Sequence, residues 1–194
     1  MTKYLVSDTH LFHDKLMGFM HRPYTTMDEM VRAFIAEWNG LVKDDDTVYH
    51  LGDFALGTDL RKIADVIKQL NGRMYLILGN HDTPNKVAFY DQFTNIEMFG
   101  SANIDGYLLT HQPVHPSLLG ERTVRSEGFG DQFCCHGHNH KNSIDDPRYF
   151  NMCWDIREKD DGRHILPFAE VKDRIQKQII DAACSVGGTI DEDI

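Results

Sequence analysis

Apolar residues in the first half of the chain follow two alternating patterns. Residues 3–8, 46–53 and 73–80 are short runs of apolar and β-branched residues, which are typical of buried strands. Between them, residues 26–41 and 60–70 repeat apolar positions at the spacing of amphipathic helices. The first half therefore predicts the order strand, helix, strand, helix, strand.

Local signals mark where these helices begin and end. Thr26 and Glu29 fit a capping box, in which each side chain satisfies a free backbone N–H of the first helical turn. Asn71 and Gly72 close the second helix. A further short helix is predicted after Pro84.

The second half has a different pattern, beginning at about residue 95. Successive strands with few helices between them are predicted at residues 95–100, 106–112, 131–138 and 148–155. A last helix, roughly Phe168 to Ala183, follows Pro167. Together the halves predict an α/β protein of two packed sheets with helices on the outside.

The length of 194 residues favours a single domain. We expect this domain to span residues 1–183, followed by an acidic, flexible tail at 184–194. Residues 112–131 form a long predicted loop rich in glycine, serine and charge. Loops of that length inside a compact domain are usually functional or mobile, so we hypothesise that this one closes over a substrate.

Composition narrows the class of protein. Hydrophobic residues make up 41% and charged residues 26%, as in an ordinary soluble globular protein. No apolar run is long enough to span a bilayer, and MTKYLVSDTH is not a signal peptide, so no membrane association is expected. The four cysteines follow no disulfide pattern, which indicates reduced thiols and a cytoplasmic location. The sequence leaves the oligomeric state open.

The formal net charge of −10 argues against a protein that grips extended nucleic acid. Such proteins neutralise phosphates with a basic surface. The charge leaves room for a nucleotide-sized substrate, because a bound metal ion reverses the local field. We therefore expect a small-molecule partner rather than DNA or RNA.

Residues of the types that bind metal ions stand where the predicted strands end. They are Asp8, His10, Asp53, Asn80, His81, Asp82, His111, His138 and His140. In open sheets with crossover helices the carboxyl ends of the strands point to one rim, so these side chains should meet there. Asp8 and His10 are two residues apart and face the same way in extended chain, as do His138 and His140. The pattern predicts a metal site.

The stretch CCHGHNH at 134–140 also raises the question of a structural zinc site. Such a site needs four closed ligands, typically two spaced pairs. Cys134 and Cys135 are adjacent, so in a strand they point to opposite faces and cannot chelate together, and no second cysteine pair exists. We interpret the cysteines as core residues.

These motifs resemble those of the calcineurin-like metallophosphoesterases, a superfamily of two-metal phosphatases, phosphodiesterases and nucleases. The matching residues are DTH (8–10), GD (52–53), GNHD (79–82), His111 and GHNH (137–140). The resemblance covers roughly residues 3 to 155. It implies a four-layer α/β/β/α sandwich, in which two mixed β-sheets are flanked by helices.

The resemblance also implies roles for individual residues at a centre of two divalent metal ions. The implied ligands are Asp8, His10 and His140 for the first ion, and Asn80, His111 and His138 for the second. Asp53 would bridge both ions, and His81 would act as general acid or transition-state stabiliser, oriented by Asp82. Carboxylate, amide and imidazole ligands suit Mn, Fe, Zn or Ni, with Mn favoured in vitro.

The implied function is hydrolysis of a small phosphodiester or nucleotide, by in-line attack of a metal-bridging hydroxide on phosphorus. A phosphomonoesterase, including a protein phosphatase, is the nearest alternative, because the same centre can host different substrates. A non-catalytic metal-binding module of the same fold is a third alternative. The presence of all seven ligand positions and of His81 disfavours it.

Four residues are candidates for contact with the substrate. They are His13, Arg22, Arg122 and Arg125. The arginines could meet a phosphate through their planar guanidinium forks, and solvated surface arginines are the alternative interpretation. His21 and His164 are expected at the surface.

Overall fold

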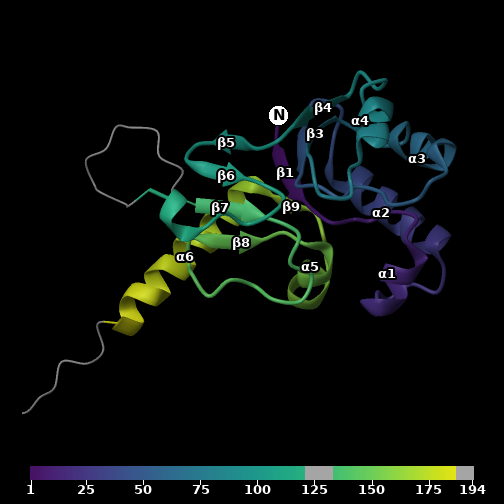
Figure 1. The fold of residues 1–194 in the computed structure, drawn as a ribbon. Coiled ribbons are helices and arrows are strands. Elements are labelled where there is room, and N and C mark those ends of the chain that lie inside the picture. The colour runs from purple at the N-terminus through teal and green to yellow at the C-terminus, as the bar shows by residue number, and fades with distance from the viewer. Residues whose placement is uncertain (121–132, 187–194) are drawn as a thin grey trace, which may run out of the picture.

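The computed structural model describes residues 1–120 and 133–186 (Figure 1). Arg122, Arg125, most of the predicted substrate loop and residues 187–194 of the predicted tail lie outside the described residues. The described chain forms two β-sheets, six helices and one short 3₁₀ turn at Pro116–Leu118.

The first sheet has the strand order β4-β3-β2-β1-β9. Its strands are β1 (Lys3–Val6), β2 (Thr47–His50), β3 (Arg73–Ile77), β4 (Ile96–Phe99) and β9 (Leu166–Pro167). The first four run parallel to their neighbours, and β9 is antiparallel to β1. The short edge strand β9 makes this sheet a mixed one.

The second sheet has the strand order β5-β6-β7-β8. Its strands are β5 (Ala102–Ile104), β6 (Tyr107–Leu109), β7 (Phe133–His136) and β8 (Tyr149–Asn151). Strands β6, β7 and β8 are parallel, and β5 is antiparallel to β6. Two mixed sheets flanked by helices confirm the predicted fold class.

Six helices connect or cover these strands. They are α1 (Asp14–Phe19), α2 (Met27–Leu41), α3 (Leu60–Ile67), α4 (Pro84–Tyr90), α5 (Trp154–Asp161) and α6 (Phe168–Val186). Figure 1 shows the second sheet on one side of the first, with α2, α3 and α4 on the other side. None of the described helices is both long and apolar enough to cross a membrane.

The first sheet is buried on both faces, which explains why its strands are continuous apolar runs in the sequence. Val6, Val48 and Leu76 belong to a cluster with Phe34 and Trp38 of α2. Because side chains alternate along a strand, the residues next to them in sequence face the other sheet.

That second face of the sheet forms the core between the two sheets. Leu5 and Ile77 of the first sheet share a cluster with Leu109 and Cys135 of the second. Val171 of α6 belongs to the same cluster. Cys134 lies in a separate cluster, so the adjacent cysteines face opposite sides of β7 as predicted.

The structure refines the predicted helix ends. Thr26 caps α2 by accepting the Glu29 N–H at 3.1 Å, but the Glu29 carboxylate accepts from Thr25 N–H at 2.8 Å and not from Thr26. The last helix continues to Val186, three residues beyond the predicted Ala183. Helices α1 and α5 were not predicted, because both are short and α5 is weakly amphipathic.

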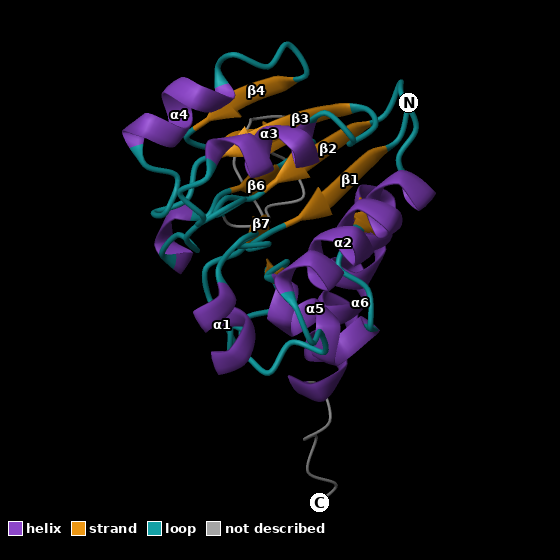
Figure 2. Cartoon of the chain, turned by 90° about the vertical axis from the view of Figure 1, so that its right-hand side faces the viewer, coloured by secondary structure: helices purple, strands orange, loops and turns teal. Residues whose placement is uncertain are grey.

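The topology brings several strand ends to one edge. Figure 2 shows the arrowheads of β1 and β4 pointing the same way, toward the side where α1 lies. The loops that follow β1, β2 and β3 start from neighbouring parallel strands, and those after β6 and β7 do so in the second sheet. The polar motif residues sit in these loops.

Candidate metal centre

The motif loops have unusual backbone conformations. Asp8, His10, Asp53 and His138 have φ angles of 57°, 46°, 56° and 65°, in the left-handed region. Such values cost a non-glycine residue on the order of 1–3 kcal/mol and cluster at functional sites. Four of the seven predicted ligands are therefore held in conformations that the surrounding structure must enforce.

Backbone hydrogen bonds between the loops after β1 and β2 hold these conformations in place. The Asp8 N–H donates to the Gly52 carbonyl at 3.1 Å, and the His10 N–H donates to the Asp53 carbonyl at 3.0 Å. Behind them, Thr9 Oγ1 lies 3.0 Å from His50 Nε2. The loop after β1 is thus fixed to the loop after β2 along its length.

Asp8, His10 and His140 form what we call the first cluster. His10 Nε2 lies 3.7 Å from Asp8 Oδ1, and His140 Nε2 lies 3.6 Å from the same oxygen. These separations are too long for hydrogen bonds, but they are close to the roughly 3.0–3.6 Å that separates ligand atoms about 2.1 Å from one ion. His10 is 3% exposed, and neither of its ring nitrogens has a hydrogen-bond partner among the described residues. The geometry fits a cation between these atoms.

Asn80, His111 and His138 form the second cluster. Asn80 Oδ1 lies 2.9 Å from His111 Nε2 and 3.0 Å from His138 Nδ1. His111 Nδ1 lies 2.8 Å from the Leu51 carbonyl, which can only accept, so Nδ1 carries a proton. His111 therefore presents Nε2 to the cluster, and the orientation of a metal-binding imidazole is commonly fixed in this way.

Asp53 lies between the two clusters. Its Oδ2 atom is 3.5 Å from His10 Nε2 and 3.4 Å from His111 Nε2, one histidine from each cluster. Its Oδ1 atom accepts the His81 backbone N–H at 2.8 Å. The bridging role that the family resemblance implies for Asp53 is compatible with this placement.

Two glycines permit the close approach of the motif loops. A Cβ atom on Gly79 would collide with the Asp53 carboxylate, and one on Gly137 would collide with Ser7 Oγ and the Asp8 carboxylate. The glycines of GNHD and GHNH are therefore needed for the two carboxylates to reach their places.

Asp82 acts differently from the prediction. Its Oδ2 atom accepts the backbone N–H groups of Gly79 at 2.9 Å and of Asp53 at 2.8 Å. Within the described chain no hydrogen bond joins it to the His81 ring, so it positions the loop that carries His81. Lys86 adds a second tie, because its ammonium donates to the His81 carbonyl at 3.1 Å.

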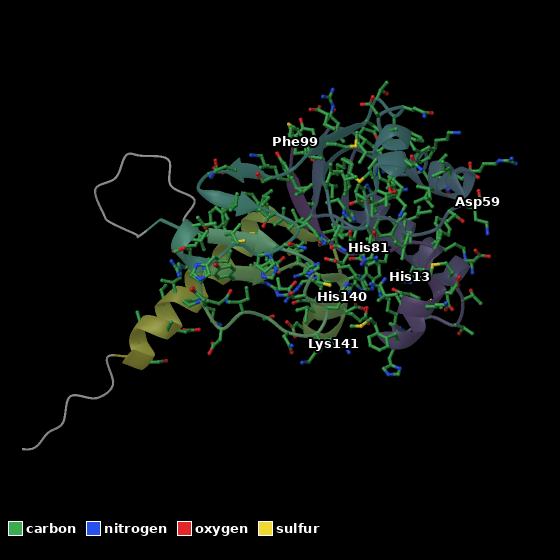
Figure 3. All side chains as sticks on the ribbon, viewed as in Figure 1. His13, Asp59, His81, Phe99, His140 and Lys141 are labelled. Carbon is green, nitrogen blue, oxygen red and sulfur yellow. The ribbon has the colours of Figure 1, made fainter. Side chains whose placement is uncertain are left out.

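His81 and His13 face the centre from its open side. The exposed His81 ring lies 5.5 Å from the His10 ring, and the His13 ring lies 6.1 Å from it. In Figure 3 the labels of His13, His81 and His140 lie close together, and all three rings lie near the His10 ring. Burial, together with the nearby His10 and His81, lowers the pKa of His13. Its predicted contact with substrate is compatible with this position.

Arg22 and Asp155 form a brace behind the first cluster. Asp155 Oδ2 lies 2.6 Å from His140 Nδ1, and the same carboxylate receives the Arg22 Nε and Nη2 atoms at 2.8 and 3.0 Å. Arg22 also donates to the Thr9 carbonyl at 2.7 Å and the Asp8 carbonyl at 2.9 Å. One guanidinium therefore ties the Asp8 loop to the carboxylate that orients His140.

This brace corrects the interpretation of Arg22 as a phosphate contact. The Arg22 side chain is 1% exposed, and its guanidinium is engaged by Asp155 and two backbone carbonyls. Asp155 was not singled out from the sequence, because it stands 15 residues from His140 and only the fold brings them together. Arg122 and Arg125 lie outside the described residues.

A buried stack continues the brace away from the centre. The Arg22 guanidinium lies 5.3 Å from the Trp154 ring centroid, and the His164 ring stacks on that indole at 3.4 Å. His164 pairs with Glu37 at 2.7 Å and with Glu158 at 2.6 Å. The prediction of a surface His164 was wrong, since its side chain is 4% exposed.

Cys153 also approaches the first cluster, with its Sγ atom 3.4 Å from His140 Nδ1. Burial raises the pKa of this thiol well above its ordinary value, which keeps it protonated. The thiol lies at Nδ1, the ring nitrogen that Asp155 contacts, whereas His140 presents Nε2 to Asp8, so Cys153 packs behind the first cluster.

The charges of the centre suit a cation. Burial raises the pKa of Asp8, but the nearby imidazoles of His10, His111 and His140 outweigh this and hold the pKa well below its ordinary value. Burial lowers the pKa of His10, which favours the neutral imidazole that binds metals. Burial also lowers the pKa of His111, but Asp53 and Asp8 outweigh it and raise the pKa to about 9. Ionised carboxylates thus create a strong local preference for positive charge.

Comparison with known proteins identifies a family with a metal-dependent activity. A sequence model described as the calcineurin-like phosphoesterase superfamily domain matches residues 1–153. An uncharacterized protein of Methanocaldococcus jannaschii is 33% identical over 149 residues, which cover 76% of this chain and 74% of that protein. The Gene 66 protein of Mycobacterium phage L5 is 26% identical over 170 residues, which cover 73% of this chain and 78% of that protein.

A solved structure shares the fold. A protein of unknown function from Aquifex aeolicus superposes with a TM-score of 0.62 over 89% of this chain and 98% of its own. The two sequences are 22% identical, so this likeness concerns the fold alone.

Proposed function

The chain belongs to the calcineurin-like phosphoesterase superfamily, and from this premise we propose that it hydrolyses a small phosphodiester or nucleotide with two divalent metal ions. Membership supports a metal-dependent hydrolase of phosphate esters at the level of the superfamily. The relatives named above carry no assigned substrate, so the preference for a small diester is our own inference.

One observation carries the proposal. The Asp53 carboxylate oxygen stands within 3.5 Å of one histidine from each cluster, which is the arrangement that two ions sharing a ligand require. When bound, such a pair of ions polarises a phosphoryl group and lowers the pKa of water. Mixed oxygen and nitrogen donors suit Mn, Fe, Zn or Ni, and we propose Mn for the assays.

The residues around the clusters would handle the substrate. The exposed His81 imidazole, which has no hydrogen bond among the described residues, would donate a proton to the leaving oxygen. Asp82 and Asp53 hold its backbone in place through Gly79 and the His81 N–H. His13 would contact the substrate from the start of α1.

A phosphomonoesterase, including a protein phosphatase, remains the alternative within the same superfamily, because the centre itself does not choose the substrate. We place a binding module without activity last. All seven predicted ligand residues and His81 lie around one site in the structure, which a module without activity would have no need to retain.

The test is Mn²⁺-dependent hydrolysis of bis(p-nitrophenyl) phosphate compared with p-nitrophenyl phosphate. We expect turnover of the diester, and loss of it in His81→Ala and Asn80→Ala variants. His21→Asn is the control, because it changes an exposed histidine outside both clusters and asparagine tolerates its positive φ of 54°. Preference for the monoester would favour a phosphatase. No turnover of either ester, with two ions shown to bind, would favour the binding module.

A further inference from the structure

A groove opens directly beside the two clusters. Its volume is about 430 Å³, and its lining comprises Leu16, Phe19, Met20, His138, Asn139, His140, Lys141 and Asn142. His138 and His140 belong to the clusters themselves. Any phosphate ester bound at the centre would therefore have this groove next to one of its substituents.

One wall of the groove is the short helix α1, whose Met17 packs against the core while Phe19 does not. None of the residues of α1 is buried, and Phe19 is 65% exposed. The Lys141 ammonium lies 4.2 Å from the centroid of the Phe19 ring and so reaches across from the opposite wall. Figure 3 shows Lys141 next to His140 in the loop after β7. Lys141 covers part of the Phe19 ring, and the rest of this exposed ring, which adds nothing to the core, is available to a ligand.

The opposite wall offers polar groups on a fixed backbone. Asn151 donates to the carbonyls of Asn139 at 2.8 Å and Asn142 at 3.2 Å, which anchors this loop. The side-chain amides of Asn139 and Asn142 make no hydrogen bond with any described residue. Each amide can donate and accept, so the wall can recognise groups that do both.

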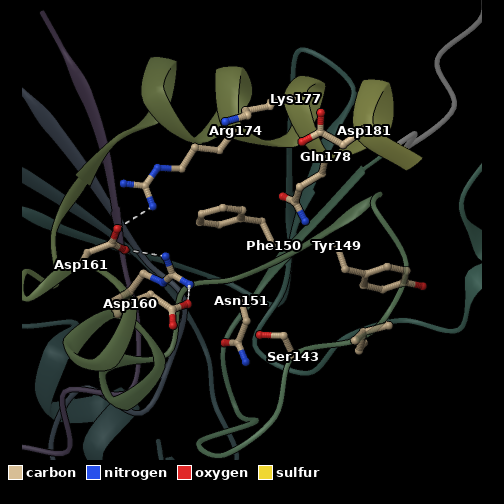
Figure 4. Close-up of a pocket in the computed structure, with 12 residues that line it drawn as sticks. Ser143, Tyr149, Phe150, Asn151, Asp160, Asp161, Arg174, Lys177, Gln178 and Asp181 are labelled. Atoms are coloured by element: carbon tan, nitrogen blue, oxygen red, sulfur yellow. Dashed lines mark hydrogen bonds and ion pairs between the residues drawn. The ribbon is translucent and has the colours of Figure 1, made fainter. Parts of the chain in front are cut away.

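The charge of the groove sets it apart from the rest of the molecule. Its lining contains no aspartate or glutamate, although the chain has 30 of them and a net charge of −10. By contrast, three aspartates line the cavity between β8, α5 and α6 (Figure 4), where Asp161 pairs with both Arg157 and Arg174. Aspartates also line the other two cavities described. A negatively charged nucleotide would therefore meet no acidic side chain in the groove beside the clusters.

We propose that this groove is the nucleoside subsite of the enzyme. The base would lie against Phe19, its edge would bond to the amides of Asn139 and Asn142, and the phosphate would lie at the two clusters. A base has the flat apolar face and the mixed donors and acceptors that these walls match. The inference rests on the proposed function and narrows its substrate to nucleotides.

The test compares adenosine 5′-monophosphate with ribose 5-phosphate, which carries a hydroxyl group in place of the base. Titration calorimetry on the Mn²⁺-loaded protein should show binding of the nucleotide that is about five- to fiftyfold tighter, as expected for stacking on an aromatic ring. Phe19→Ala should remove this preference without changing the affinity for ribose 5-phosphate. Phe19→Tyr should keep it, and Ile180→Ala, which removes another exposed apolar side chain, should leave both affinities unchanged.

A second measurement avoids metal and phosphate altogether. Adenosine added to the metal-free protein should shift the NMR signals of Phe19, Asn139 and Asn142. Equal affinity for the two phosphates, or a preference that survives Phe19→Ala, would overturn the subsite. Hydrolysis of bis(p-nitrophenyl) phosphate is measured separately. Turnover without a preference for the nucleotide would reject the subsite alone, and a preference for the nucleotide without turnover would reject the proposed function alone.

Discussion

The two halves of the candidate metal centre are built differently. In the first cluster Asp8 is fully buried and His10 is 3% exposed, and the brace of Arg22 and Asp155 holds the third member, His140. In the second cluster Asn80 is exposed and His138 is half-buried. Only His111 there is buried, with its ring fixed by a backbone carbonyl.

This difference has a consequence for metal binding. A ligand set that is already fixed loses little freedom when an ion binds, whereas exposed side chains must be ordered at that moment. We therefore expect the first cluster to bind its ion more tightly than the second. The second cluster, which is open to solvent, would be the side on which an ion exchanges more readily.

The largest expected effect comes from the residue that both halves share. Asp53→Asn should reduce kcat by about a thousandfold, because it removes the charge between the clusters and leaves a weaker donor. Metal titration should show the loss of at least one of two bound ions. Asp105→Asn is the matched control, since Asp105 also has a positive φ, of 55°, but lies exposed in the turn between β5 and β6. If Asp53→Asn still bound two ions with unchanged affinity, Asp53 would not be the residue that bridges them.

A second variant tests the first cluster by steric hindrance, without changing any candidate ligand. In Gly137→Ala the new methyl group would press on Ser7 and the Asp8 carboxylate, and should displace that ligand. A displacement of about 1 Å can cost about a hundredfold, so we expect that loss in kcat/KM. In Gly100→Ala the methyl group would meet no atom within 4 Å, and activity should be normal. Equal activity of the two variants would show that the contact between these loops is dispensable.

A third variant tests whether the brace of Arg22 and Asp155 causes the difference between the two clusters. Asp155→Asn should weaken metal binding at the first cluster by about tenfold and leave the second cluster unchanged, because removal of a partner that orients a metal-binding histidine typically has this effect. Asp160→Asn serves as the control, since Asp160 lies on the same helix and is 46% exposed. Calorimetric titration with Mn²⁺ resolves the two steps. If both steps weakened equally, the brace would serve the whole centre and the contrast between the halves would need another cause.

The sequence motifs singled out residues that the structure brings together around one site, but they did not reveal the brace. Asp8 and His10, or His138 and His140, are pairs within single loops, so short motifs record them. The parallel strands that precede them are apolar runs, so their order along the chain and their approximate ends follow from the local sequence pattern. Asp155 and Arg22 stand 133 residues apart and meet only in the folded chain. No local pattern in a single sequence distinguishes such a pair from surface charges.

The errors have the same origin. His164 and Arg22 are polar residues in polar surroundings along the chain, which indicates exposure, but each is buried by partners distant in sequence. The family resemblance implied that Asp82 orients His81, whereas its carboxylate accepts hydrogen bonds from the backbone of Gly79 and Asp53. The missed helix α5 lacks a clear apolar face and is held at its start by the buried Trp154.

The smallest expected effect lies at the far end of the stack behind the brace. Glu37 accepts the backbone N–H groups of His164 and Ile165 at 2.6 and 2.9 Å and pairs with the His164 ring. Glu37→Gln should lower the free energy of unfolding at pH 7 by about 1 kcal/mol, the usual net value of such bonds. Affinity of the first cluster for Mn²⁺ should change by less than about twofold, because Trp154 and Arg22 lie between Glu37 and the ligands.

The effect of pH on that variant follows from the carboxylate. Burial raises the pKa of Glu37, but its bonds to His164 and to the backbone outweigh this and lower the pKa below the ordinary 4.5. Because the folded pKa is depressed, the stabilisation is present above pH 4.5 and is lost as the pH falls through the folded value. Urea unfolding of the two proteins should therefore give curves that differ at pH 7 and converge as the pH falls well below 4.5. A loss of Mn²⁺ affinity as large as that of Asp155→Asn would instead extend the brace to Glu37, and the first cluster would depend on a support reaching to α2.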